Sequence, residues 1–145
     1  MSGSPRRAVS WLEQAEFDLE AARLSLEHGY FEWASFQSQQ SAEKALKGLL
    51  VLLDGYAPRG HRLAGLLALI GHFNPQLRQE LHASITDLEA ATFVSRYPFA
   101  IPTERMSPHE FIEKEDAVAC LDEATQLVQK VQRVVQRLRE PSSVL

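Results

Sequence analysis

The chain has a single cysteine among its 145 residues, Cys120, so an intramolecular disulfide cannot form. Its apolar runs all fall short of the roughly 20 residues that a transmembrane helix needs, and its first residues show no pattern typical of a secretory leader. Basic residues are fewer than acidic ones, with 15 Lys and Arg against 19 Asp and Glu, so the net charge is −4. Proteins that bind duplex DNA favour a basic surface. These absences predict a cytoplasmic protein that neither spans a membrane nor binds duplex DNA.

Signatures of metal and cofactor chemistry are missing as well. The five histidines show no i,i+4 pairing with one another or with a suitable set of carboxylates, as a helical metal site requires. The chain also has no glycine-rich phosphate loop, no arrangement of Ser, His and Asp that suggests a catalytic triad, and no Cys-x-x-Cys motif. We therefore predict neither a metal site nor a cofactor.

Apolar residues recur at helical spacing along most of the chain, and no segment alternates in the manner of a strand. The pattern predicts helices over about residues 5–28, 31–53 and 61–73, a further one from Pro75, and a last one from residue 107 or 114 to about 139. Three prolines within 95–108 predict an ordered loop there. We expect one all-α domain over residues 1–145, ordered over about 5–139. Its architecture would be an antiparallel bundle of four main helices with an additional short helix.

The segment 31–53 is the most informative part of the chain. Its small residues form one narrow stripe, which lets another helix approach closely: Ala34, Ser38, Ser41, Ala45 and Gly48. Two apolar pairs lie away from the core stripes, Phe17 with Leu24 in the first helix and Phe36 with Leu50 in the second. Exposed apolar patches usually mark interfaces, so we predict a homodimer built on these four side chains.

The order of these features resembles the HEPN family of small helical domains. Three stretches carry the resemblance over about residues 8–138: Trp11-Leu12-x-x-Ala15-x-x-Asp18-Leu19-x-x-Ala22, Ser35-Phe36-x-x-Gln39-Gln40-x-x-Glu43-Lys44-Ala45-Leu46-Lys47, and His61-Arg62-Leu63-x-x-Leu66-Leu67. Ser95-Arg96-Tyr97-Pro98 and an amphipathic last helix follow in the expected order. The resemblance implies a bundle that is commonly dimeric. It also implies one of several roles: a metal-independent ribonuclease, a nucleotide-binding module, or the companion of a nucleotidyltransferase, including in toxin–antitoxin pairs.

The ribonuclease members use an arginine, then four to six residues, then a histidine, late in the domain. Here Arg78 and His82 have only three residues between them, as do Arg105 and His109. Arg23 and His28 have four, but they lie in the first helix. An arginine and a histidine must reach one scissile phosphate to cleave it, so we do not expect robust ribonuclease activity.

Five residues are candidates for binding an anionic ligand, each with a structural alternative. Lys44 and Lys47 could meet phosphates, or Lys47 could form an exposed i,i+4 pair with Glu43 worth about 0.3–0.5 kcal/mol. His61 could be a ligand or a general base, or it could cap the next helix or bond a backbone carbonyl. Arg96 and Tyr97 could line a pocket or hold the proline-rich loop. The favoured hypothesis is a module that binds a nucleotide or RNA end and works with a nucleotidyltransferase. An atypical ribonuclease and a pure protein-interaction domain are the alternatives.

Overall fold

The computed structural model describes residues 3–60, 62–83, 85–96 and 108–140, with the backbone alone at 92–96 and 108–109. Within these ranges all regular structure is helical, which confirms the all-α prediction. The helices are α1 (Pro5–Glu27), α2 (Phe31–Asp54), α3 (Leu63–Phe73), α4 (Pro75–Glu80), α5 (Thr86–Arg96), α6 (Pro108–Phe111) and α7 (Lys114–Arg139).

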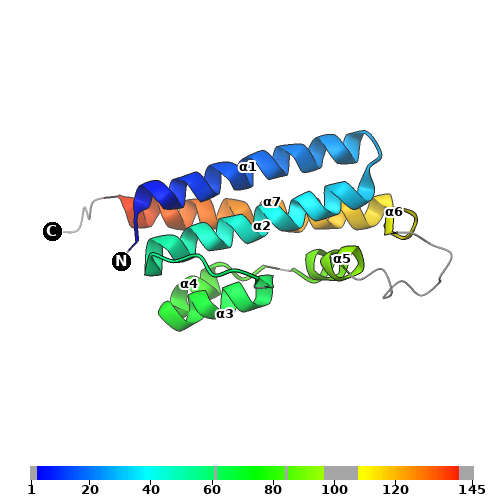
Figure 1. Ribbon diagram of the computed structural model, residues 1–145. Helices are drawn as coiled ribbons and strands as arrows, with labels where there is room; N and C mark the ends of the chain where they lie inside the picture. The colour runs from blue at the N-terminus through cyan, green and yellow to red at the C-terminus, as the bar shows by residue number, and fades with distance from the viewer. Residues whose placement is uncertain (1–2, 61, 84, 97–107, 141–145) are drawn as a thin grey trace.

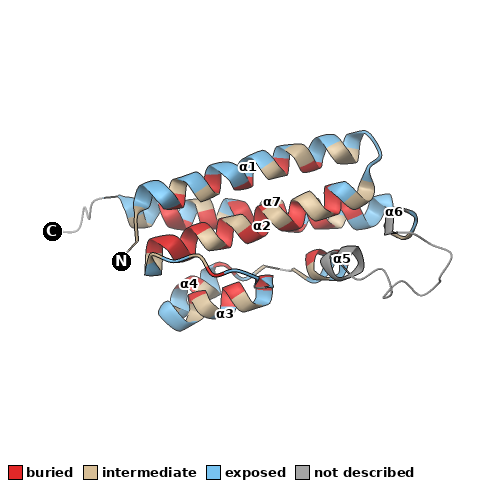
Figure 2. Ribbon diagram, viewed as in Figure 1, coloured by how far each residue is buried: buried red, intermediate tan, exposed pale blue. Residues whose placement is uncertain are grey.

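Three long helices, α1, α2 and α7, lie side by side, and α3, α4 and α5 form a second layer below them (Figure 1). The chain turns at Gly29, whose φ of 82° suits glycine, so α2 runs antiparallel to α1. α2 is central because it packs against α1, α3, α5 and α7. Its buried residues lie both toward the other long helices, α1 and α7, and toward the second layer (Figure 2). No described helix is both long and apolar enough to cross a membrane; the cytoplasmic location stays a prediction.

Leu50 does not belong to an exposed patch, so its assignment to a dimer interface is wrong. Its side chain is 1% exposed and lies in the core cluster, because α2 is covered by helices on more than one side. The other three residues of the predicted interface are accessible. Phe17 and Leu24 are 69% and 51% exposed, and Phe36 is half-buried with its ring edge-to-face against Trp33.

The apolar spacing from Pro75 to Leu88 suggests one helix, but the structure has two. α4 ends at Glu80, and α5 begins at Thr86. A new helix start has N–H groups without helical partners. The buried carboxylate of Glu123 on α7 accepts a hydrogen bond from the Leu88 N–H at 3.0 Å, which satisfies one of them. α5 also continues to Arg96, so residues 95–96 belong to a helix rather than to the expected loop.

The last helix begins at the later of its two expected starts. A capping box fixes this point, because the side chains of Glu113 and Asp116 each bond the other's backbone N–H. The alternative start at Ser107 lies outside the described residues, and the short α6 precedes α7 as a separate turn.

Candidate functional site

The small-residue stripe of α2 packs closely against another helix, as the sequence predicts, and the structure shows that this helix is α1. The hydroxyl of Ser41 donates a 2.6 Å hydrogen bond to the backbone carbonyl of Ala15, and both residues are buried. At Gly48 the contact is closest: a Cβ there would lie 2.9 Å from the Cβ of Trp11. The missing side chain of Gly48 therefore determines where Trp11 lies.

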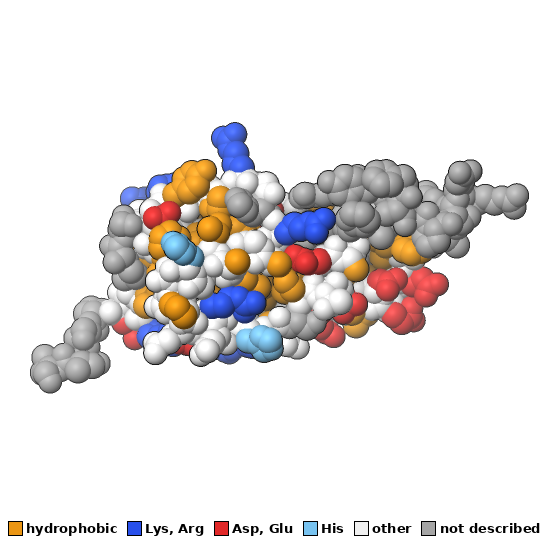
Figure 3. All heavy atoms as spheres, turned by 90° about the horizontal axis from the view of Figure 1, so that it is seen from below, with side chains coloured by type: hydrophobic (Ala, Val, Ile, Leu, Met, Phe, Trp, Pro, Cys, Tyr) orange, Lys and Arg blue, Asp and Glu red, His pale blue; other side chains and the backbone are white. Residues whose placement is uncertain are grey.

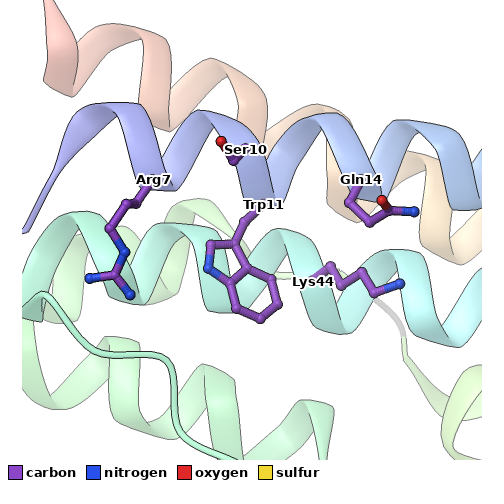
Figure 4. Close-up of a pocket in the computed structure, with 5 residues that line it drawn as sticks. All are labelled: Arg7, Ser10, Trp11, Gln14 and Lys44. Carbon is purple, nitrogen blue, oxygen red and sulfur yellow. The ribbon is translucent and has the colours of Figure 1, made fainter.

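Around Trp11 the surface forms a hollow of about 290 Å³ between α1 and α2, here named the α1–α2 hollow. Its lining is Arg7, Ser10, Trp11, Gln14 and Lys44. The half-buried indole of Trp11 lies between the side chains of Arg7 and Lys44 (Figure 4). Two cations from different helices thus flank one aromatic ring, with hydroxyl and amide groups nearby.

The two cations of the hollow differ in their partners. Lys44 donates to a carboxylate oxygen of Asp18 at 2.5 Å, and this pair is only partly exposed. The guanidinium of Arg7 makes a long, 3.5 Å hydrogen bond to the carbonyl of Gly55. Among the described residues, no carboxylate lies within ion-pair distance of Arg7. The hollow therefore carries about one uncompensated positive charge, supplied by Arg7.

The predicted ligand residues are only partly brought together. Lys44 lines the α1–α2 hollow, but Lys47 does not. Lys47 pairs instead with Glu43 at 3.7 Å, which confirms the i,i+4 partner. The expectation that this pair is exposed is wrong, since the two side chains are 13% and 10% exposed. His61 and Tyr97 lie outside the described residues, as does the side chain of Arg96. That these groups converge on one ligand stays a prediction.

A buried polar row on α2 was not singled out from the sequence. Ser35, Gln39 and Glu43 follow one another at four-residue spacing and are 0%, 3% and 8% exposed, and Lys47 continues the row. The i,i+4 recurrence of polar residues was the available signal. Burying such groups costs free energy unless they find partners. Gln39 accepts a 2.8 Å hydrogen bond from Gln40, and Glu43 pairs with Lys47, so these partners lie within α2 itself.

A second hollow, here named the α2–α3 hollow, has a volume of about 440 Å³. Its lining includes Leu50, Asp54, Tyr56, Arg59, Leu69 and Phe73. On the face in Figure 3, acidic side chains gather at one end, and basic and hydrophobic side chains occupy much of the other half. Within the described ranges, no group of three or more His, Cys, Asp or Glu could hold a metal ion.

Comparison with known proteins agrees with this architecture. Residues 8–134 match the HEPN domain family. Over 130 residues the chain is 29% identical to "Putative toxin MJ1304" of Methanocaldococcus jannaschii, a match that covers 86% of this chain and 85% of that protein.

Two solved structures are also similar. ST0689, an archaeal HEPN homologue, is 36% identical with a TM-score of 0.63, and the match covers 89% of this chain and 98% of that one. TT1696 from Thermus thermophilus is 33% identical with a TM-score of 0.65, covering 88% and 97%. The chain therefore belongs to the HEPN domain family.

Proposed function

We propose that this HEPN domain is a binding module for a nucleotide or an RNA end, and that the ligand's phosphate and base occupy the α1–α2 hollow. The observation that carries the proposal is the placement of Arg7 and Lys44 on either side of Trp11. Cationic side chains bind phosphate oxygens, and a base stacked on an aromatic ring gains about 1–3 kcal/mol in proteins that bind single strands. The Ser10 hydroxyl donates to the carbonyl of Arg6 and Nε2 of Gln14 donates to Asp18, so these groups offer the ligand their oxygen atoms as acceptors.

Asp18 limits how strongly the hollow attracts an anion. Its carboxylate already holds Lys44 at 2.5 Å, so an incoming phosphate must share or replace that contact. Binding is therefore weak and falls as salt rises, because partly exposed charges are screened. Removing the charge of Asp18 would leave Lys44 available to the ligand.

Calorimetry with ATP and GTP at millimolar ligand tests the proposal. We expect Arg7→Ala and Trp11→Ala to weaken binding about fivefold or more, which corresponds to about 1 kcal/mol or more. Asp18→Asn should strengthen it. Arg133→Ala, which removes an exposed cation on α7, is the matched control and should leave binding unchanged.

Lys47→Ala separates this site from the one expected from the sequence. Lys47 does not line the hollow, so its removal should leave the affinity unchanged. The proposal is wrong if wild type gives no heat of binding, or if Arg7→Ala and Trp11→Ala bind as well as wild type. A pure protein-interaction domain would then be the remaining hypothesis.

The proposed module acts in the cytoplasm as a homodimer and works with a nucleotidyltransferase in a toxin–antitoxin pair. The exposure of Phe17 and Leu24, with the half-buried Phe36 on the adjoining helix, supports the dimer. The toxin name of the M. jannaschii relative supports the toxin-like role. Sedimentation at micromolar concentration should show a dimer that Phe17→Glu dissociates. A 16.3 kDa monomer of the wild type would contradict it.

That toxin name also favours a second candidate function, a metal-independent ribonuclease with an atypical site. Turnover of single-stranded RNA without added metal, lost in His28→Ala, His82→Ala or His109→Ala, would establish it over the binding module.

A further inference from the structure

A ligand that is a strand rather than a single nucleotide needs a second place to stack a base, and the α2–α3 hollow has the required composition. Tyr56 and Phe73 contribute aromatic rings that are 61% and 45% exposed. The buried Leu50 and the partly buried Leu69 supply an apolar floor, and Arg59 supplies a guanidinium. Aromatic platforms beside cations are the usual elements of single-strand binding.

The two hollows are adjacent. Arg7, which lines the α1–α2 hollow, donates from Nη1 to the carbonyl of Gly55. Gly55 ends α2 with a φ of 77°, and its two chain neighbours, Asp54 and Tyr56, both line the α2–α3 hollow. Arg7 therefore reaches from the first hollow to the chain segment that lines the second.

We propose that the α2–α3 hollow is a second base-binding subsite, so that the module binds a single-stranded oligonucleotide across both hollows. This inference rests on the proposed function of the α1–α2 hollow. The base of one nucleotide stacks near Trp11 and that of another near Tyr56 and Phe73, while Arg7 and Arg59 contact the backbone phosphates. The carboxylate of Asp54 repels phosphate, which keeps the backbone on the arginine side and the base among the rings.

A third hollow, between α1 and α7, shows that size alone does not identify the subsite. It is about 480 Å³, larger than either of the other two. Its lining has two carboxylates, Glu16 and Glu20, against one guanidinium, Arg23, and it has no aromatic ring. A polyanion would meet net negative charge there and no stacking surface, so the two hollows that adjoin at Gly55 are the suitable pair.

Fluorescence anisotropy with a labelled cytidine octaribonucleotide, alongside calorimetry with cytidine monophosphate, tests the proposal. We expect the octamer to bind at least tenfold more tightly than the mononucleotide. Tyr56→Ala and Arg59→Ala should each weaken octamer binding, Tyr56→Ala by about 5- to 150-fold, which corresponds to about 1–3 kcal/mol of stacking. Neither should change mononucleotide binding. Tyr30→Ala is the matched control, because Tyr30 is 62% exposed and lies at the turn between α1 and α2.

The outcomes separate this inference from the proposed function. If Trp11→Ala weakens octamer binding and Tyr56→Ala and Arg59→Ala do not, the α2–α3 hollow is not a subsite, and the proposed function of the α1–α2 hollow is retained. If only Tyr56→Ala and Arg59→Ala weaken octamer binding, the α1–α2 hollow is not a binding site, and the proposal that a strand spans both hollows is wrong. An octamer that binds no better than the mononucleotide, or not at all, overturns the inference. Because Tyr56 and Arg59 are exposed, their variants should keep the thermal midpoint of wild type.

Discussion

Replacing Gly48 with alanine tests how α1 and α2 fit together and how that fit positions the α1–α2 hollow. The added Cβ would lie 2.9 Å from the Cβ of Trp11 and 3.1 Å from the carbonyl oxygen of Ala8. Both atoms are held by the α1 backbone and cannot rotate away. The two helices must therefore separate by a few tenths of an ångström, and Trp11 must move with α1.

Two opposing effects set the magnitude. Adding a methyl group to a packed contact costs about 1–3 kcal/mol. Alanine gains about 0.8–1 kcal/mol over glycine in the interior of a helix. The free energy of unfolding should therefore fall by up to about 2 kcal/mol, which for a chain of this size lowers the thermal midpoint by several degrees. The affinity for ATP should fall too, because the indole is displaced.

Gly71→Ala is the matched control, since Gly71 also lies inside a helix. Its Cβ would meet Cγ and Cβ of Arg78 at 3.2 and 3.3 Å, and Arg78 belongs to the six-residue α4, which can adjust. We expect a change between zero and a gain of about 1 kcal/mol, the helix-propensity term. Thermal and urea unfolding followed by circular dichroism measures both variants. A Gly48→Ala variant more stable than wild type, or a Gly71→Ala variant that loses more stability than Gly48→Ala, would refute the reasoning.

Three further results are expected. Ser41→Ala removes a buried hydrogen bond to the carbonyl of Ala15 and should cost about 0.5–1.5 kcal/mol in urea unfolding. Burial raises the pKa of the Cys120 thiol from 9.0 to about 12, so it should resist alkylation at pH 8 unless the chain is denatured. The folded state keeps that proton more tightly, so this contribution to stability is complete below about pH 9 and is lost as the pH rises towards 12. Arg137→Ala breaks a paired contact with Glu80, but both side chains are about half exposed, so unfolding should change by less than about 1 kcal/mol.

The helices of this chain follow from local sequence. Helical spacing of apolar residues, the cap at Asn74 and the turn at Gly29 act within a few residues, so they can be read without the fold. The small stripe of α2 was equally visible, because only close packing against another helix favours serine and glycine at such positions. It predicted a close approach of another helix, but neither that α1 would be that helix nor that Ser41 would bond Ala15.

Other features depended on which helices cover α2, and a single helix does not encode that. Leu50 reads as an off-core residue only if one side of α2 is buried; the second layer buries it. For the same reason, the sequence predicted the partners Glu43 and Lys47 correctly but wrongly predicted that the pair is exposed. The start of α5 has a partner that local sequence does not reveal, because the Leu88 N–H bonds Glu123, 35 residues away in the chain.

The sequence by itself determined the all-α class, the family and most helix bounds, because helical periodicity and caps are local. Only the tertiary structure decided the site. In the folded chain, Lys44 pairs with Asp18 and lines the α1–α2 hollow together with Arg7 and Trp11. Lys47 is largely buried and pairs with Glu43. Arg7 and Lys44 are 37 residues apart in the chain, and only the packing of α1 on α2 at Gly48 brings them to one surface.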